Sequence, residues 1–149
     1  MKKGFSIAEL VIVASIIGIL ASLVVPILQN RTTEAKVAAA RDNLRLLRVA
    51  IRLYAARHHG VAPGYESNDP DGAFSSETFM DQTVTLERYL RRMPANPFNN
   101  RTTMSMVGNG GSFPAEATGA FGWIYQPATE TVRLDWPGTD DGGIRYYDY

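Results

Sequence analysis

An uninterrupted apolar segment near the N-terminus constrains this chain more than any other feature. Leu10–Leu28 holds 19 consecutive residues without a charged side chain. Because a helix rises about 1.5 Å per residue, about 20 such residues cross the hydrocarbon core of a bilayer. Pro26 removes one backbone donor and predicts a kink near the end of the helix. The segment therefore predicts a transmembrane helix, and small residues that let helices approach closely lie within it: Ala14, Ser15, Gly18, Ala21 and Ser22.

Simpler interpretations of this segment explain only part of it. A cleaved secretory signal has a basic start, an apolar stretch of about 7–15 residues and a small residue before the cleavage site. Met1-Lys2-Lys3 fits the start, but the apolar stretch is longer and ends in Val25-Pro26-Ile27-Leu28. A buried core helix is disfavoured because the rest of the chain offers too little apolar surface to cover it. A plain membrane anchor fits the length but leaves Glu9 unexplained.

Glu9 favours a helix that meets a charged partner. A carboxylate inside hydrocarbon costs on the order of 3 kcal/mol on insertion scales, and more when it is unpaired. Such a residue therefore usually has a cation beside it. The alternative is that Glu9 lies near the membrane face and reaches the water of the lipid headgroups, where this cost falls.

The residues around Glu9 resemble a known processing signal. Gly4–Leu10 reads Gly-Phe-Ser-Ile-Ala-Glu-Leu and follows a short leader that contains lysine. It is similar to the class III signal of type IV pilins and type II secretion pseudopilins, whose usual pattern is Gly-Phe-Thr-Leu-Ile-Glu-Leu. Ser6–Ala8 departs from that pattern with small or apolar side chains. Ile19–Pro26 also resembles the helix of the family, including its proline.

This resemblance implies a processing step and a mode of assembly. A membrane-embedded prepilin peptidase would cut between Gly4 and Phe5, remove residues 1–4 as a leader and methylate the new amino group of Phe5. The resemblance also implies that the Glu9 carboxylate pairs with the Phe5 amino group of a neighbouring subunit. Pairing two desolvated opposite charges relieves a penalty that each would otherwise bear alone. A subunit inserted out of register leaves both charges unpaired, so the pair could also specify the stagger between subunits.

Helical spacing continues after Leu28, although the composition turns polar. No proline or glycine occurs between Gln29 and His59, and Gly60 followed by Pro63 is a stop signal. The sequence therefore predicts one helix over residues 5–59, with a membrane half (5–28) and an amphipathic half (29–59). One apolar row runs along the second half at spacings of three and four residues: Val37, Ala40, Leu44, Leu47, Ile51, Tyr54 and His58, widened by Leu46, Ala50 and Leu53.

Four arginines form a basic row on the same half: Arg41, Arg45, Arg48 and Arg52. A solvated helix face and pairing with acidic patches on adjacent subunits both stay open. Nucleic-acid binding is disfavoured, because 15 basic and 15 acidic side chains leave the whole chain neutral. The adjacent side chains of His58 and His59 point in different directions on a helix, which disfavours a metal site.

Residues 60–149 predict a globular head built from loops, short helices and a C-terminal hairpin. Two segments that flank a turn place large apolar side chains at every second position, which predicts an antiparallel hairpin. These side chains are Phe121, Trp123 and Tyr125 in the first segment and Val132, Leu134 and Trp136 in the second. The aromatic face of the hairpin is expected to pack on the Leu44–Tyr54 face of the long helix. The fold class is therefore α+β and pilin-like, with a long N-terminal helix packed on a small antiparallel sheet.

The remaining parts of the head give weaker patterns. Helical pieces are predicted from Ser75 and over Thr85–Arg92, where Pro94 follows. Arg101–Ala120 predicts a long loop, and Ile144–Tyr149 a short edge strand. Tyr89–Phe98 resembles a segment of major pseudopilins, which have a similar Tyr-Leu and two prolines before an aromatic residue. The absence of cysteine also suits that branch better than pilins closed by a C-terminal disulfide.

Acidic residues gather around a glycine-rich turn near the C-terminus: Asp135, Asp140, Asp141 and Asp148. Major pseudopilins that resemble this chain bind calcium in a loop toward the C-terminus, and calcium requires hard oxygen donors. The sequence lacks a close match to that loop, so no ligand is carried over from the family. Asp140 and Asp141 are the calcium candidates, and a solvated acidic turn is the favoured alternative.

No nucleophile–base pair, phosphate loop or metal-ligand spacing stands out, so no enzyme activity is expected. The resemblance implies a single-pass subunit of the bacterial inner membrane, surrounded by lipid before assembly and with its head in the periplasm. An assembly platform and its ATPase would extract it into a helical homopolymer that also contains minor pilins or pseudopilins. A type II secretion pseudopilin that supports protein export is favoured. The alternatives are a type IV pilin of a surface pilus, for adhesion, motility or DNA uptake, and a low-copy tip pilin with a binding role.

Overall fold

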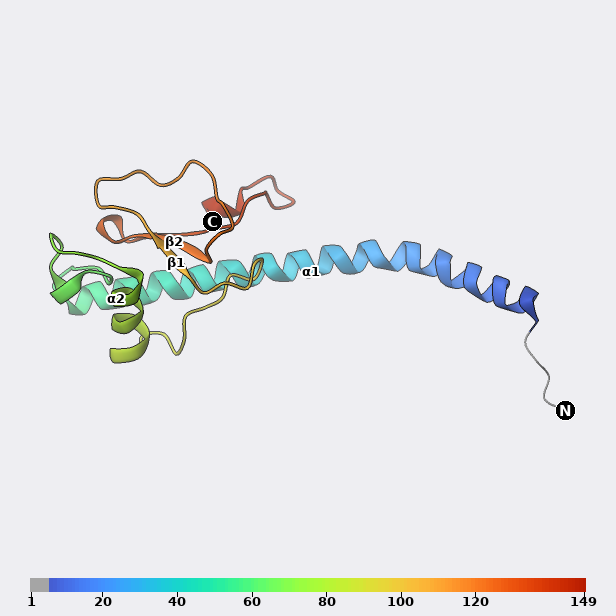
Figure 1. The fold of residues 1–149 in the computed structure, drawn as a ribbon, viewed down its shortest axis with the longest axis horizontal. Coiled ribbons are helices and arrows are strands. Elements are labelled where there is room, and N and C mark those ends of the chain that lie inside the picture. Colours follow the sequence, from blue (N-terminus) through green and yellow to red (C-terminus); the bar gives the residue numbers. More distant parts are fainter. Residues whose placement is uncertain (1–5) are drawn as a thin grey trace. The chain divides into compact units, whose positions relative to one another are not determined.

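The computed structural model describes residues 6–149, apart from the side chains of Leu23 and of residues 25–30. One long helix, α1 (Ile7–Arg57), is followed by a short helix, α2 (Ser76–Met80), and three strands (Figure 1). The strands are β1 (Met104–Met106), β2 (Trp123–Gln126) and β3 (Thr131–Leu134). The chain divides after Ala35 into an N-terminal unit and a head unit, Lys36–Tyr149, and α1 contributes to both.

The long helix predicted over residues 5–59 is observed over Ile7–Arg57. The helix ends just before Gly60, as the predicted stop signal indicated. Gly60 adopts a left-handed φ of 86°, and its N–H donates to the carbonyl of Ala55 at 2.8 Å. Glycine adopts this conformation without the steric cost that a Cβ atom would bring. Pro26 lies within the helix, but its side chain is outside the described set, so the kink stays a prediction.

The membrane half of α1 also stays a prediction. Within the part of the chain that the structure describes, no helix combines the length and the apolarity of a membrane span. The leader over residues 1–4 and Phe5 lie outside the described residues.

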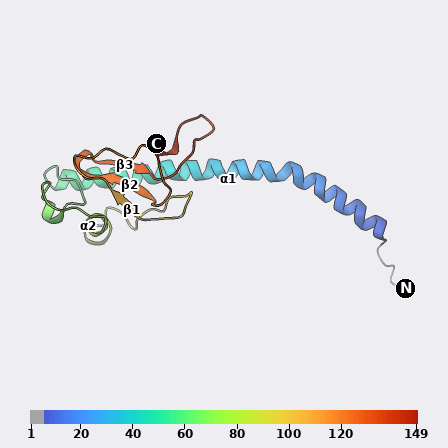
Figure 2. The same ribbon diagram turned by 45° about the horizontal axis from the view of Figure 1, so that its top comes forward.

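The sheet has the strand order β1-β2-β3 (Figure 2). β2 and β3 form the predicted antiparallel hairpin, with Trp123 opposite Leu134 and Gln126 opposite Thr131. β1 pairs with β2 in parallel, so the sheet is mixed rather than wholly antiparallel. β1 lies within Arg101–Ala120, for which the sequence predicts a loop. The sequence does not reveal this strand, because three residues are too few to show a period of two.

One face of the sheet packs against α1 in the head unit (Figure 1). The predicted apolar row of the helix supplies one side of the core, and the hairpin supplies the other. Trp123, Tyr125 and Leu134 are fully buried there, as the alternation of the hairpin predicted, whereas Phe121 is exposed. The helix residues in this core are Ala40, Leu44, Leu47, Ala50 and Ile51.

The helix predicted over Thr85–Arg92 is wrong. α2 begins where the N-cap predicted it, since Ser75 Oγ accepts a hydrogen bond from the Thr78 N–H at 3.0 Å. It continues as one π-helical turn, Asp81–Leu86, and the chain then leaves the helix with Arg88 at a left-handed φ of 55°. This change of direction lets the Leu90 N–H donate to the Thr83 carbonyl and buries the Leu90 side chain.

The edge strand predicted over Ile144–Tyr149 is also wrong. The segment makes a single β-bridge, from Arg145 to Thr139, and then a 3-10 turn, Tyr146–Asp148. Tyr146 and Tyr147 are both buried. A strand would place adjacent side chains on opposite faces, so a turn suits two neighbouring buried aromatic residues better.

Candidate functional site

Glu9 caps the start of α1. Its Oε2 accepts a hydrogen bond from the Ser6 N–H at 2.8 Å, and Ser6 Oγ accepts one from the Ala8 N–H at 3.3 Å. Serine followed three residues later by glutamate is the signature of a capping box; here Glu9 reaches back to the Ser6 N–H, and the Ser6 hydroxyl caps the N–H of Ala8. The Ser-x-x-Glu spacing of residues 6–9 is the sequence signal for this cap, and the prediction of a charged partner for Glu9 did not include it. Within residues 6–149 the cap uses one of the two carboxylate oxygens, and Phe5, the predicted partner in a neighbouring copy, is not among those residues.

The first half of α1 presents apolar side chains all around its axis. Its serines do not disturb this surface, because the Ser15 and Ser22 hydroxyls each donate to a carbonyl of the same helix at 2.7 Å. A continuous exposed apolar surface marks contact with a membrane or with other protein. The residues, each about half exposed or more, are Ile7, Leu10, Val11, Ile12, Val13, Ile16, Ile17, Ile19, Leu20 and Val24.

A second apolar row lies on the head half of α1. Leu46, Val49 and Leu53 follow at spacings of three and four residues and are 55%, 47% and 47% exposed. The sequence had placed Leu46 and Leu53 beside the core row, together with Ala50. The structure buries Ala50 and leaves both leucines uncovered within the head unit. The helix therefore carries one apolar row for its own head and another that its head does not cover.

The basic row of α1 does not act as one surface. Arg41 Nη2 lies 3.0 Å from Asp140 Oδ2, and its guanidinium lies 4.3 Å from the centre of the Tyr149 ring. Arg48 Nη2 donates to the Tyr149 carbonyl at 2.5 Å. Burial and, to a smaller extent, the neighbouring Arg52 lower the pKa of the Arg48 side chain. Arg41 and Arg48 thus bind their own head, while Arg45 and Arg52 are exposed.

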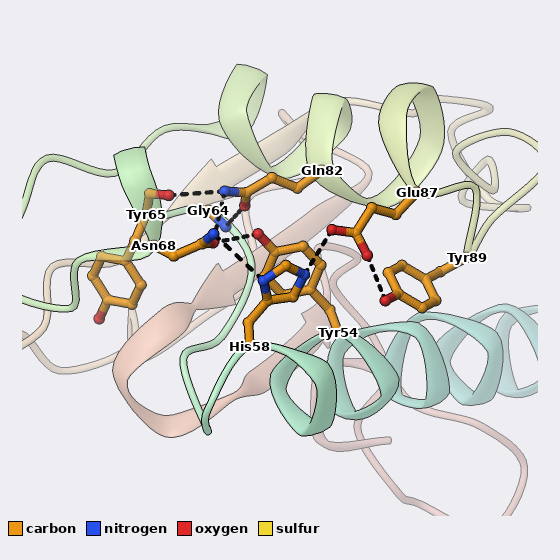
Figure 3. Close-up of polar contacts among 8 residues, drawn as sticks. All are labelled: Tyr54, His58, Gly64, Tyr65, Asn68, Gln82, Glu87 and Tyr89. Carbon is orange, nitrogen blue, oxygen red and sulfur yellow. Dashed lines mark hydrogen bonds and ion pairs between the residues drawn. The ribbon is translucent and has the colours of Figure 1, made fainter.

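A polar cluster fastens the C-terminal end of α1 to the head (Figure 3). His58 stacks on Tyr54 with ring centres 4.0 Å apart, and its Nε2 lies 2.6 Å from Glu87 Oε1. The Tyr89 hydroxyl donates to Glu87 Oε2 at 2.6 Å and is the main reason that the pKa of Glu87 is lowered. Tyr54 donates to Asn68 Oδ1, and burial is the main cause that raises the pKa of Tyr54 to about 12.

Gln82 extends this cluster to the loop after α1 (Figure 3). Its Oε1 accepts from the Gly64 N–H at 2.7 Å, and its Nε2 donates to the Tyr65 carbonyl at 2.9 Å. His58 is thereby committed to contacts that hold the fold. His59 is exposed, and no group of three or more potential metal-binding side chains occurs among the described residues.

Asp135 is a fully buried carboxylate that organises the loop before β2. It accepts hydrogen bonds from the N–H groups of Thr118, Gly119 and Phe121 at 2.7, 3.1 and 2.8 Å. The Thr118 hydroxyl supplies a fourth at 3.0 Å. A buried charge is tolerated when its hydrogen-bonding capacity is met in this way. Asp135 therefore stands apart from the acidic turn with which the sequence grouped it.

Asp140, the first of the two calcium candidates, also has its carboxylate oxygens occupied by hydrogen-bond donors. Asp140 Oδ1 accepts from the N–H groups of Gly142 and Ile144, both at 2.9 Å. Its Oδ2 accepts from Arg41 at 3.0 Å and from the Tyr149 hydroxyl at 2.7 Å. Calcium takes about 6–8 oxygen ligands, whereas both oxygens of this carboxylate already face hydrogen-bond donors. Asp140 with its neighbour Asp141, which is exposed, does not fit a calcium ion in this arrangement.

Three curated proteins that are similar to this chain share the name type II secretion system core protein G. The chain is 26% identical to the type II secretion system core protein G of Pseudomonas aeruginosa over 81% of this chain and 85% of that protein. It is 26% identical to the protein of the same name from Escherichia coli K12 over 91% of both chains. For the Aeromonas hydrophila protein of that name, the identity is 29% over 81% of this chain and 85% of the relative.

No protein-family model matches the chain, and no solved structure gives a significant match. The similarity to the three relatives covers most of the chain and includes the head as well as α1. It agrees with the α+β architecture of a long N-terminal helix on a small mixed sheet. Over most of its length the chain is therefore similar in sequence to type II secretion system core protein G, and its fold is consistent with a type IV pilin-like pseudopilin.

Proposed function

We propose that this chain is a structural subunit of a type II secretion pseudopilus, which polymerises through α1 to support protein export. The observation that supports this most strongly is the difference between the two halves of α1 in which apolar side chains are exposed and which are buried. Its first half presents apolar side chains on all sides, and its second half gives one apolar row to its own head. A helix of this kind needs lipid or further copies of itself to cover the remaining apolar surface.

Glu9 is proposed as the residue that fixes how copies join. Cleavage between Gly4 and Phe5 would create an amino group at the tip of the helix, beside the carboxylate that the capping box holds in place. The charge of this amino group would pair with Glu9 of the next copy when the apolar surfaces meet. Because an unpaired charge in an apolar environment is costly, subunits that dock with both charges satisfied are favoured over other registers.

The partners and the location follow from the same proposal. Before assembly the first half of α1 would lie in the inner membrane, with the head on the periplasmic side. A prepilin peptidase would process the chain, and an assembly platform with its ATPase would move it into the filament, together with minor pseudopilins. The subunit itself catalyses no reaction in this proposal. The names of the three relatives support the assignment to type II secretion.

The experiment that tests this function compares Glu9→Ala with two control variants in cells that express the secretion machinery. Glu9→Ala should leave cleavage and methylation intact, as measured by mass spectrometry. It should reduce sheared filaments by at least about tenfold, because 1.4 kcal/mol already changes an equilibrium tenfold and an unpaired buried charge costs more. Normal filament yield from Glu9→Ala would contradict the proposal.

The controls separate charge pairing from helix capping and from general effects on α1. Ser6→Ala removes the capping hydroxyl but keeps the carboxylate, so filament yield should stay near that of the unmodified chain. Glu34→Ala removes an exposed acid elsewhere on α1 and should have no effect. A loss of filaments in Ser6→Ala equal to that in Glu9→Ala would assign the role of Glu9 to capping instead.

A further inference from the structure

The C-terminal loop of the head, residues 137–149, is closed by a cationic side chain from α1. Asp140 lies at the centre of this closure and accepts four hydrogen bonds, two at each carboxylate oxygen. Two of the donors are backbone N–H groups of the loop itself, from Gly142 and Ile144. The other two, from Arg41 and Tyr149, connect the loop to the helix and to the end of the described chain.

Arg41 contacts both partners of this closure at once. Its guanidinium lies 3.0 Å from Asp140 Oδ2 and stacks 4.3 Å from the centre of the Tyr149 ring. Arg48 lies seven residues further along α1, two turns away on the same face. It donates to the Tyr149 carbonyl at 2.5 Å and to the Val132 carbonyl at 3.4 Å. The two arginines therefore hold the loop and the end of the hairpin on one face of the helix.

These contacts supply what a divalent cation would supply in an oxygen-rich loop. A calcium ion joins carboxylate and carbonyl oxygens from distant residues by attracting about 6–8 of them. Here the guanidinium places positive charge beside the carboxylate. A planar guanidinium can also bind a carboxylate and stack on an aromatic ring at the same time. A second cation at Asp140 would have to displace Arg41 and would be repelled by it.

We propose that Arg41 is the resident cation of this loop, so that the head closes residues 137–149 without calcium. This inference concerns the folding of the head and does not depend on polymerisation. The protonation states of the partners agree with it. Hydrogen bonds, first of all the one from Tyr149, lower the pKa of Asp140, and burial, aided by this hydrogen bond, raises the pKa of Tyr149 to about 12. The carboxylate therefore stays charged and the phenol stays a donor near neutral pH.

The first test compares thermal unfolding of the purified full chain in detergent, with excess calcium chloride or with excess EGTA. Circular dichroism should give the same Tm in both, and titration with calcium should give no heat of binding above that of buffer. A Tm raised by several degrees in calcium, with the increase lost in Asp140→Asn, would overturn the inference. This comparison needs no variant of Arg41 and decides the question even if such variants fail to fold.

The second test asks whether Arg41 stabilises residues 137–149 in the absence of calcium. In EGTA, Arg41→Ala should lower Tm by about 4 °C, the shift expected for a loss of about 1 kcal/mol in a domain of this size. Arg45→Ala, an exposed arginine one turn away, should leave Tm unchanged. Arg41→Lys should recover part of the loss, because lysine keeps the charge but not the planar stacking.

Hydrogen exchange provides a local readout of the same closure. The amides of Gly142 and Ile144 donate to Asp140, so they should be protected in the unmodified chain in EGTA. In Arg41→Ala they should exchange at least about tenfold faster, while amides of the hairpin change little. Equal Tm and equal protection in Arg41→Ala and the unmodified chain would show that the loop closes without this cation, and would overturn the inference.

Discussion

At the scale of single residues, three carboxylates are held by donors of three different origins. Glu9 is held by the first turn of its own helix, and Asp135 by the N–H groups of a neighbouring loop. Asp140 is held by its own loop together with an arginine from α1. Each carboxylate fixes a local backbone path, and the origin of its donors determines which elements it joins.

Asp135→Asn tests the role of the buried carboxylate. The substitution keeps the shape but replaces an oxygen acceptor with an N–H₂ donor, which would face the N–H groups that the carboxylate now binds. We expect a loss of about 2–3 kcal/mol in the free energy of unfolding, in the range for hydrogen bonds to charged groups. Urea unfolding followed by tryptophan fluorescence measures it. Asp141→Asn, at an exposed position, is the control, and equal stability of the two variants would refute the role of Asp135.

Residue patterns revealed some of these roles and concealed others. The capping box of Glu9 is local, so its Ser-x-x-Glu spacing can be read directly from the sequence. The partners of Asp135 lie 14 to 17 residues away, and Arg41 lies 99 residues from Asp140. Side chains brought together over such separations leave no spacing that a single sequence could show. The grouping of Asp135 with Asp140 in the sequence therefore placed residues with unrelated partners together.

At the scale of elements, the strength of the repeating pattern decided which predictions were confirmed. The head half of α1 has an apolar row that repeats over several turns, and the hairpin has large apolar side chains at every second position on both sides of its turn. Both elements form where the sequence placed them. β1 has three residues, and the path of residues 87–92 depends on a left-handed residue, Arg88, and a tertiary hydrogen bond. Such elements are set by contacts within the folded head rather than by local periodicity.

The two apolar rows of α1 can be separated by a matched pair of neighbouring leucines. Leu47 is fully buried in the core, whereas Leu46 is 55% exposed. Leu47→Ala should lower the free energy of unfolding by about 2–5 kcal/mol, the usual cost of removing a buried leucine side chain. Leu46→Ala should change it by no more than about 0.5 kcal/mol. Chemical denaturation of the full chain in detergent measures both.

Filament yield tests whether the exposed apolar row of α1 contacts neighbouring copies. If the row of Leu46, Val49 and Leu53 is covered by neighbouring copies, the triple change to serine should reduce sheared filaments while the head remains folded. Leu46→Ala alone should give a smaller reduction in the same direction. Full filament yield from the triple variant would mean that this row faces solvent or lipid instead.

At the scale of the whole molecule, α1 has two functions: it exposes apolar surface, and it forms one side of the core of the head. The head covers one apolar row of α1 and binds two arginines of this helix, Arg41 and Arg48. The cluster around His58 holds the C-terminal end of α1 on the head. The apolar first half and the second apolar row remain for lipid or for other copies. This arrangement agrees with the proposal of a building block whose remaining apolar surface is covered on assembly.

The most direct test of this proposal is the first residue of subunits recovered from assembled filaments. Mass spectrometry of the N-terminal peptide should find N-methylated Phe5, because cleavage after Gly4 would create the amino group that we propose pairs with Glu9, while the apolar half of α1 is retained. A filament subunit that still begins with Met1, or one that begins at Ser22 after loss of the apolar segment, would contradict it.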